Sequence, residues 1–382
     1  MRISELLRRK IPEPLKPLLR YLLRIPREYL QSLKQFIIKI KQDKLLRKSY
    51  NNSTKKIIIF FTRGFDFVNG GVLSISSIYE ETIRLKYIHG AEVVMCTVPG
   101  EPFLLKYTKF NNRNFIFRFS QCLDYFKNVE KITLHIPEYS IFFLRRISRE
   151  DILKLTKIDD IHFNIMLQNI RLLPDNAQEY IKELKKIGKV TCTTAHQQYS
   201  TPEIRKKIDI PLHKLSTYIS PEQYDRKSYN QKENLMIVSP DNHPQKAEIL
   251  DLIRKQLPKI RIQIIENLTY EEFKNIIKRA KWALTFGEGL DGYFIETIFS
   301  GGISFAVYNT EFFTEDFKHL RTVYENYDKL IENICLDINE LDNEKKYTQY
   351  QKEQYSICSK HYEYKEYIRN LELFYRGQYT YP

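Results

Sequence analysis

The sequence predicts two α/β domains, each built on a parallel sheet with helices on both faces, preceded by a basic helical extension. Three observations carry this prediction. From residue 55 onward, short apolar runs alternate with longer amphipathic segments, which is the pattern of parallel strands joined by helices. A polar stretch over residues 220–233 interrupts this alternation once. The 382 residues are also enough to bury a core in each of two domains.

The extension comprises residues 1–50, which contain fourteen basic and four acidic side chains and therefore carry +10 of the chain's net +14. Two segments show an apolar stripe at helical spacing among basic residues: Leu15, Leu18, Leu19 and Leu22, then Leu30, Leu33, Ile37 and Ile40. An apolar stripe flanked by cations is typical of a helix that lies on an anionic membrane surface. A helical pair packed on the body, with its basic face in solvent, is the alternative.

Charge and cysteine content narrow the function classes. Outside residues 1–50 the net charge is only +4, so no basic domain surface for nucleic acid is expected. The five cysteines lie far apart and form no C-x-x-C pair, which indicates neither a disulfide framework nor a zinc site and favours a cytoplasmic compartment. No apolar run approaches the roughly 20 residues that cross a bilayer. Basic residues and prolines interrupt the N-terminal leucines, which disfavours a signal peptide.

The first Rossmann-like domain is expected over residues 55–222. Its predicted strands are 56–62, 91–97, 114–118, 131–135, 160–166, 189–194 and 214–219. Amphipathic helices are predicted between strands, for example at 74–88 and 175–187. Residues 223–233 are then the best linker to the second domain.

The second Rossmann-like domain is expected over residues 234–345, followed by C-terminal helices in 346–382 that pack back across both domains. Its predicted strands are 235–239, 261–265, 282–286 and 303–308, and its predicted helices are 246–256, 269–279 and 293–299. Two such domains face each other across a cleft between the carboxyl ends of their sheets. Open α/β sheets bind ligands at those ends.

A glycine-rich turn in the second domain is the first candidate site. Gly287, Gly289 and Gly292 lie between a predicted strand and a short helix, where backbone N–H groups form a seat for a diphosphate. Glu288 and Glu296 flank this seat with seven residues between them. Carboxylates repel phosphates, so their expected partners are hydroxyls of a ribose or a hexose.

With Gly301-Gly302 and a new apolar strand behind it, this segment resembles the retaining GT-B glycosyltransferases that carry an E-x7-E motif, the family-4-like type. The resemblance implies a nucleotide-sugar donor against the second domain, with Glu296 at the ribose and Glu288, as a catalytic residue, at the donor sugar. The donor-binding residues it implies in this segment are Gly287, Glu288, Gly289, Asp291, Gly292, Glu296 and Thr297. Asp291 stands where the family usually has glycine.

The segment over residues 235–250 resembles the same family's first strand and loop of the donor domain. Lys246 matches the lysine that neutralises the donor diphosphate and is a candidate for both donor binding and catalysis. The arginine expected after the strand is absent, so Arg63 and His243 are possible helpers. No D-x-D sequence follows a predicted strand, so a metal-bridged diphosphate is not indicated and no metal is expected. No cofactor is expected, since the nucleotide-diphosphate sugar is itself the substrate.

Three segments of the first domain are further candidates. Gly70 and Gly71 resemble the loop that closes over donor and acceptor, although a plain turn before a helix is an equal alternative. His196, after the strand at 189–194, resembles the histidine beside the reacting sugar and is a catalytic candidate; a hydrogen-bonded structural histidine is the alternative. His135 and Glu138 are interpreted as following another strand. They are candidates for contacts with the acceptor.

Together these features predict a hexosyltransferase-type, metal-independent and retaining glycosyltransferase. It is expected in the cytoplasm, peripheral on the inner face of the cell membrane, with residues 1–50 on the anionic surface. Its partners would be a nucleotide-sugar donor and a glycan acceptor that is lipid-linked, in the biosynthesis of a surface polysaccharide such as lipopolysaccharide or capsule. Two alternatives stay open: a GT-B-shaped nucleotide-sugar epimerase, which needs no acceptor, and a non-catalytic membrane-surface scaffold, which binds no nucleotide.

Overall fold

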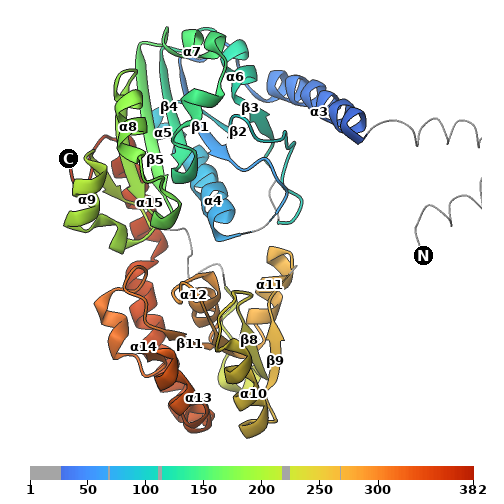
Figure 1. The fold of residues 1–382 in the computed structure, drawn as a ribbon, viewed down its shortest axis with the longest axis vertical. Helices are drawn as coiled ribbons and strands as arrows, with labels where there is room; N and C mark the ends of the chain where they lie inside the picture. Colours follow the sequence, from blue (N-terminus) through green and yellow to red (C-terminus); the bar gives the residue numbers. More distant parts are fainter. Residues whose placement is uncertain (1–26, 68, 111–113, 217–223, 267) are drawn as a thin grey trace, which may run out of the picture.

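A computed structural model of the chain describes residues 27–67, 69–110, 114–216, 224–266 and 268–382. Two α/β domains lie one above the other along the longest axis of the molecule (Figure 1). This is the predicted fold class. The predicted helix around Leu15 to Leu22, the end of the strand predicted at 214–219 and the first part of the predicted linker lie outside the described residues.

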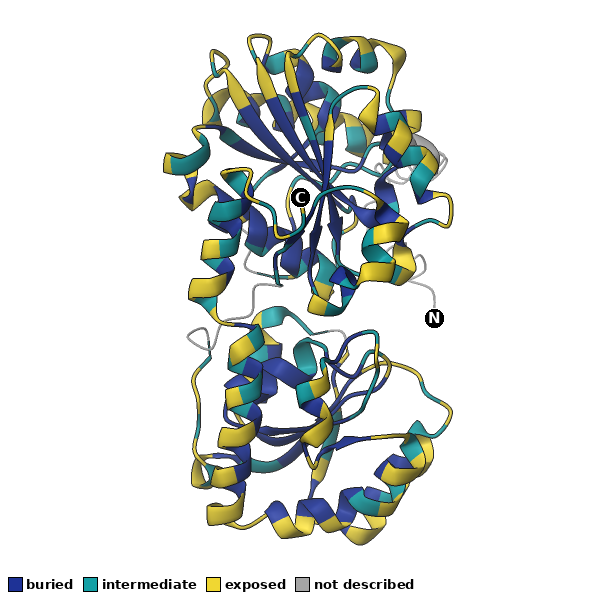
Figure 2. Cartoon of the chain, turned by 90° about the vertical axis from the view of Figure 1, so that its left-hand side faces the viewer, coloured by how far each residue is buried: buried dark blue, intermediate teal, exposed yellow. Residues whose placement is uncertain are grey.

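The first domain contains a seven-stranded, wholly parallel sheet in the order β3-β2-β1-β4-β5-β6-β7. Its strands are β1 (Lys56–Thr62), β2 (Glu92–Thr97), β3 (Ile116–Arg118), β4 (Lys131–Pro137), β5 (Asp160–Leu167), β6 (Lys189–Thr194) and β7 (Leu212–Lys214). Most of their residues are buried, because helices cover both faces of a parallel sheet (Figure 2). The seventh strand lies earlier than predicted, because the polar residues His213 and Lys214 pair with β6 and the described strand ends there.

The helices of this domain are α4 (Gly70–Arg84), α5 (Lys86–His89), α6 (Phe119–Tyr125), α7 (Arg149–Leu155), α8 (Ala177–Lys185) and α9 (Pro202–Ile208). Short 3-10 turns follow several strands: η2 (Glu138–Ser140), η3 (Phe143–Arg146), η4 (Ile170–Leu172) and η5 (Gln197–Ser200). Helix α4 begins four residues before its predicted start. The reason is a side-chain cap, since Val72 N donates to Asn69 Oδ1 at 2.8 Å.

The second domain contains a five-stranded parallel sheet in the order β12-β11-β10-β8-β9. Its strands are β8 (Glu233–Val238), β9 (Arg261–Ile264), β10 (Ala280–Leu284), β11 (Ile303–Val307) and β12 (Val323–Tyr324). Its helices are α10 (Lys246–Gln256), α11 (Tyr270–Ile277), α12 (Gly292–Phe299) and α13 (Tyr327–Leu341), with the 3-10 turns η7 (Tyr229–Gln231) and η8 (Glu315–His319). Trp282 in β10 is fully buried at the centre of this core.

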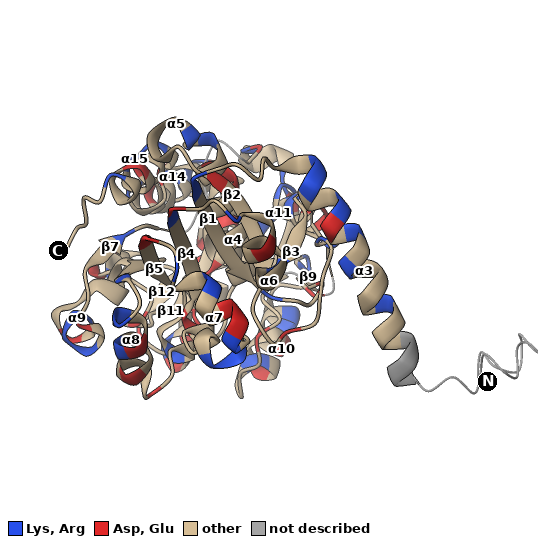
Figure 3. Ribbon diagram, turned by 90° about the horizontal axis from the view of Figure 1, so that it is seen from above, with Lys and Arg blue, Asp and Glu red and all other residues tan. Residues whose placement is uncertain are grey.

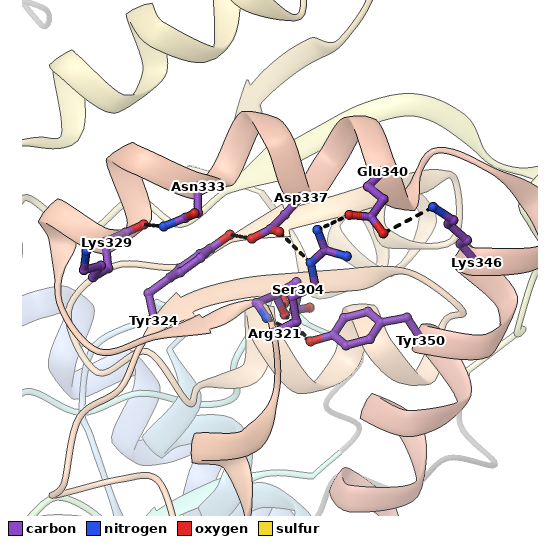
Figure 4. A network of polar contacts seen from close by, with 10 residues as sticks. Ser304, Arg321, Tyr324, Lys329, Asn333, Asp337, Glu340, Lys346 and Tyr350 are labelled. Carbon is purple, nitrogen blue, oxygen red and sulfur yellow. Dashed lines mark hydrogen bonds and ion pairs between the residues drawn. The ribbon is translucent and has the colours of Figure 1, made fainter.

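A polar network holds α13 to the short edge strand β12 (Figure 4). Asp337 accepts hydrogen bonds from Arg321 Nε at 2.5 Å and from Tyr324 OH at 2.7 Å. Arg321 Nη2 also donates to Glu340 at 2.5 Å. Because β12 has only two residues, these side chains supply the attachment that a longer ladder would otherwise give.

The C-terminal helices α14 (Glu344–His361) and α15 (Tyr364–Tyr375) pack against different domains. Helix α14 contacts α12 and α13 of the second domain, whereas α15 contacts α5 and β7 of the first. Tyr375 OH lies 2.9 Å from Thr82 Oγ1 and 3.0 Å from His135 Nε2. After α15, Tyr381 pairs antiparallel with Leu212 at the edge of the first sheet.

Helix α3 (Arg27–Ser49) precedes the first domain and reaches beyond the body, with Lys and Arg residues along it (Figure 3). Its C-terminal half packs beside β3 and α6, and Gln42 and Leu46 are buried there. The last third of the predicted extension is therefore in contact with the first domain. No helix in the described part of the chain combines the length and the hydropathy that crossing a membrane requires.

Candidate functional site

Each sheet has one point where the strand order reverses. In the first sheet the chain moves outward from β1 to β3 and then returns to the other side of β1 with β4. In the second sheet the same reversal lies between β8 and β10. Loops that leave the carboxyl ends of such strand pairs diverge and leave room for a ligand. The loops after β8 and β10 are therefore the primary candidate site.

Lys246 begins α10 and closes the loop after β8. Its Nζ donates to the carbonyl oxygens of Ser239 at 2.7 Å and Asp241 at 2.8 Å. An ammonium group has three donors, so one N–H remains for an anion. Partial loss of hydration lowers the pKa of Lys246.

The glycine-rich turn follows β10 and is tied to the neighbouring loop, since Phe286 N donates to Ser239 Oγ at 3.0 Å. Gly287 and Gly289 have φ values of 70° and 77°, which favour glycine. A methyl group added to Gly287 would lie 3.3 Å from Asp241 Cγ. The Asp241 carboxylate therefore stands beside the turn, in the part of the loop where the resemblance led us to expect an arginine.

Asp291 and Gly292 shape the start of α12. Phe294 N donates to Asp291 Oδ1 at 3.0 Å, so Asp291 is the N-cap of the helix. Burial raises the pKa of this carboxyl group. A methyl group on Gly292 would lie 2.9 Å from Glu296 Oε1, so the missing side chain makes room for that carboxylate. The capping role gives Asp291 a structural reason to stand where the family has glycine.

Glu296 lies in the interior, with only 5 % of its surface exposed. Tyr270 OH donates to its Oε2 at 3.0 Å. Burial is the main reason that the pKa of Glu296 rises to about 7. Thr297 is fully buried, and a methyl group on Gly302 would lie 2.5 Å from its Cγ2, so Thr297 packs in the core beneath the turn.

In the first domain, Gly70 and Gly71 form the first residues of α4. Space is open in front of Gly70, where an added methyl group would meet no atom within 4 Å. The Gly71 carbonyl accepts a hydrogen bond from Gln168 Nε2 at 3.3 Å. The start of α4 is thereby joined to the loop after β5.

Glu138 and Asn169 connect this edge to the second domain. The Glu138 carboxylate accepts the backbone N–H groups of Gln168 and Asn169, both at 3.2 Å. Burial raises its pKa to about 7. Asn169 Nδ2 then donates to Glu288 Oε1 at 3.1 Å. Burial is the main cause of the raised pKa of Glu288, and neighbouring Asp241 raises it further.

His196 lies just after β6, where its ring meets the second domain. Its ring centroid is 5.3 Å from that of Tyr199 and 5.7 Å from that of Phe312. Loss of hydration among these rings lowers the pKa of His196 to about 4, so the imidazole is neutral at pH 7.

Two more side chains cross between the domains near His196. Arg171 Nε donates to Glu311 at 2.7 Å, and Gln198 Nε2 donates to the carbonyl of Phe313 at 2.5 Å. The loops after β5 and β6 of the first domain thus contact the loops after β10 and β11 of the second. Glu288 and His196 both lie within this zone of contact.

Three other expected contributors have different partners. Arg63 pairs with Glu101 at 2.6 Å and covers the Tyr139 ring. His243 lies in the loop after β8, where its ring stacks on Tyr327 with centroids 3.7 Å apart and on Phe286 with centroids 6.0 Å apart. The reading of His135 as a residue that follows a strand is wrong, because β4 continues to Pro137 and His135 is only 1 % exposed.

Sequence reasoning did not find Asn169, Asp241 and Tyr270. Asn169 and Asp241 each follow a strand at its carboxyl end, the same signal that selected His196. Tyr270 lies on α11, 26 residues before Glu296, and nothing local in the sequence joins the two. Among the described residues, no three His, Cys, Asp or Glu side chains gather as ligands of a metal ion would.

No protein-family model matches the sequence, and no curated protein matches it. Solved structures, in contrast, align with this chain. Sucrose-phosphate synthase from Thermosynechococcus elongatus aligns with a TM-score of 0.52 at 11% identity, over 84% of this chain and 98% of that chain. HepE from Anabaena, solved in complex with UDP and glucose, aligns with a TM-score of 0.51 at 7% identity and the same coverage. These neighbours are GT-B glycosyltransferases, and the likeness shows that this chain has the two-domain GT-B fold.

Proposed function

We propose that this protein is a glycosyltransferase that moves a sugar from a nucleotide-diphosphate sugar to a glycan acceptor. The observation that carries the proposal is the hydrogen bond between Asn169 of the first domain and Glu288 of the second. It brings the carboxylate beside the glycine-rich turn into the zone where the two domains meet. A donor held by one domain and an acceptor held by the other would react there.

The diphosphate would lie against the glycine-rich turn. The third N–H of Lys246 and the backbone N–H groups of the glycine-rich turn are the proposed donors for it, with the positive end of the α12 dipole behind them. Negative charge grows on the departing phosphate, so these groups favour the transition state over the ground state. Asp241 and Glu288 repel phosphate and instead suit sugar hydroxyls.

The proposal extends to a retaining, metal-independent hexosyl transfer. Glu288 accepts hydroxyl hydrogens of the donor sugar, Glu296 accepts a ribose hydroxyl from the Gly292 side, and neutral His196 offers a hydrogen-bonding ring nitrogen at the domain contact. Thr297 supports the turn from beneath. Gly70 and Gly71 leave the backbone of α4 open to an approaching acceptor.

The acceptor is proposed to be lipid-linked, as in the assembly of a surface polysaccharide at the inner face of the cell membrane. The net charge of +10 over residues 1–50 supports this part of the proposal. A basic extension would hold the enzyme at the surface where a lipid-linked substrate is found.

Thermal unfolding with UDP, GDP, ADP and CMP tests the donor site. A specific ligand at one hundred times its Kd stabilises the protein by about 2.7 kcal/mol. Lys246→Met should weaken this effect, whereas Lys255→Met, an exposed lysine of the same helix, should not. Absence of stabilisation by any nucleotide would favour a scaffold. Conversion of the donor sugar without an acceptor would favour an epimerase.

A further inference from the structure

Helix α3 has one face fixed to the first domain. Gln42 Nε2 donates to the carbonyl of Ile116 at 2.8 Å, and Leu46 is buried. Phe103 N donates to Gln35 Oε1 at 2.8 Å, about two helical turns before Gln42. Ile116 lies in β3, the edge strand of the sheet, so this face of α3 closes an exposed sheet edge.

The opposite face of α3 is apolar and exposed. Leu33, Phe36, Ile37 and Ile40 expose 48, 57, 45 and 41 % of their surfaces. At about 100° per residue these four side chains fall within an arc of about 100°, centred roughly half a circumference from Gln42. We call them the α3 ridge. A soluble helix normally turns such a stripe toward its own core, and α3 turns it away.

Lysines flank the α3 ridge. Lys34 and Lys41 are exposed on one side of it, Lys39 is exposed on the other, and Lys44 is exposed one turn beyond Ile40 at its C-terminal end. The acidic residue in this part of the helix, Asp43, accepts a hydrogen bond from Gln121 Nε2 of the first domain. The ridge is therefore bordered by positive charge, and the one nearby carboxylate is engaged with the body.

We propose that the α3 ridge is the membrane contact of this protein, inserted among the headgroups of an anionic lipid surface with the flanking lysines at the level of the phosphates. Two interactions bind a helix to such a surface: the burial of its apolar side chains and the attraction of its cations to anionic headgroups. The inference rests on the proposed function only in naming where the lipid-linked acceptor is met.

The positive charge beside the ridge favours anionic lipid over the other molecules or segments that could cover this face. A second copy would bring the same lysines toward each other, and four side chains cover far less than the roughly 800 Å² per partner of a stable interface. Residues 1–26 contain seven basic and two acidic side chains, so they too repel α3. Anionic lipid complements the charge and accepts the apolar side chains.

Because glutamines and Leu46 fix α3 to β3, binding also orients the first domain. A flexible tether would hold the protein near the membrane in any orientation. A docked helix turns the side of the first domain that α3 covers toward the bilayer.

Co-sedimentation of the full chain with phosphatidylcholine vesicles, with and without phosphatidylglycerol, tests the proposal. Binding should require the anionic lipid and weaken as salt is added. Ile37→Glu should lower the partition coefficient by about tenfold or more. Leu336→Glu is the matched control, because Leu336 is 65 % exposed on α13 of the other domain, and it should bind like the natural chain. Both variants should keep the melting temperature.

Fluorescence gives a second measurement. The chain has one tryptophan, Trp282, which is buried and supplies a constant background. Emission from Phe36→Trp should shift to the blue on anionic vesicles and be quenched by brominated acyl chains. Unchanged vesicle binding of Ile37→Glu would overturn the proposal, as would a dimer of the natural chain that Ile37→Glu dissociates. Nucleotide stabilisation of the same variants reports separately on the proposed function.

Discussion

Asn169 is the side chain through which the first domain reaches the carboxylate of Glu288. Its backbone is held by Glu138, and its amide donates across the domain boundary. An amide at this place fixes one carboxylate oxygen and leaves the other for a sugar hydroxyl. Asn169 is therefore a positioning residue in the proposed reaction.

Asn169→Ala should lower kcat by about tenfold, the value of a lost hydrogen bond to a charged group, with a smaller change in KM. Arg171→Ala is the control, because Arg171 also crosses to the second domain but its ion pair with Glu311 is largely exposed. Steady-state kinetics compare the two. Equal losses would mean that domain contact in general, and not the orientation of Glu288, is what matters.

Glu296→Gln should change stability and donor affinity in opposite directions. The folded protein holds the Glu296 proton up to about pH 7, whereas an unfolded glutamate releases it near 4.5. The natural chain therefore loses stability as the pH rises through this interval, by about 3 kcal/mol in total, and the neutral amide avoids the loss. Glutamine still accepts the Tyr270 hydrogen bond.

The measurement is urea unfolding of both proteins at pH 5 and pH 8, with nucleotide titrations at pH 8. We expect the variant to gain stability relative to the natural chain at the higher pH and to bind the nucleotide less tightly. A pH-independent difference would show that Glu296 is ionised throughout. Unchanged nucleotide affinity would remove it from the proposed donor site.

The sequence could predict which residues lie near the carboxyl ends of the strands in the two sheets. It could not predict which side chains surround them. The glycines of the turn were found because positive φ angles select glycine. The burial of Glu296 and its bond to Tyr270 depend on how α11 packs against α12, which no local pattern records. The Asp291 cap was visible as a residue type, although the resemblance drew attention to a missing glycine instead.

At the scale of elements, α3 makes the sharpest contrast between its two faces. Leu46→Ala should destabilise the protein by about 2–5 kcal/mol, because Leu46 is 2 % exposed in the first-domain core. Leu33→Ala, on the same helix and 48 % exposed, should stay within about 0.5 kcal/mol. Urea unfolding without lipid measures both. Similar losses at the two positions would mean that the ridge is covered in solution.

Elements with a clear period were predicted closely. Helix α10 matches its predicted bounds, and β1 and β6 match theirs. The apolar residues of α10 repeat at helical spacing, β1 is a continuous apolar run, and β6 alternates Val190 and Cys192 with threonines. The seventh strand was misplaced because its ladder includes His213, which is buried by contacts with α15 and the C-terminal residues. A strand whose partners come from the far end of the chain carries no local signal.

At the scale of the molecule, the first domain is assembled from two distant parts of the sequence. Leu371 of α15 is fully buried in a cluster with residues of β1, β2 and α4. Leu371→Ala should therefore lower stability by about 2–5 kcal/mol. Leu336→Ala, on the exposed face of α13, should have little effect. Hydrogen exchange should locate the loss in β1 and α4, and a loss confined to the second domain would contradict this arrangement.

The return of α15 also sets an order of events during protein synthesis. Residues 56–216 leave the ribosome before the second domain, yet Tyr375 of α15, which contacts His135, and Tyr381, which pairs with Leu212, are made after it. Until then that side of the first sheet remains open, while the second domain, continuous in sequence, can complete its own core. The domain that is made first is therefore finished last, and its uncovered sheet is the surface that a chaperone would meet on the nascent chain.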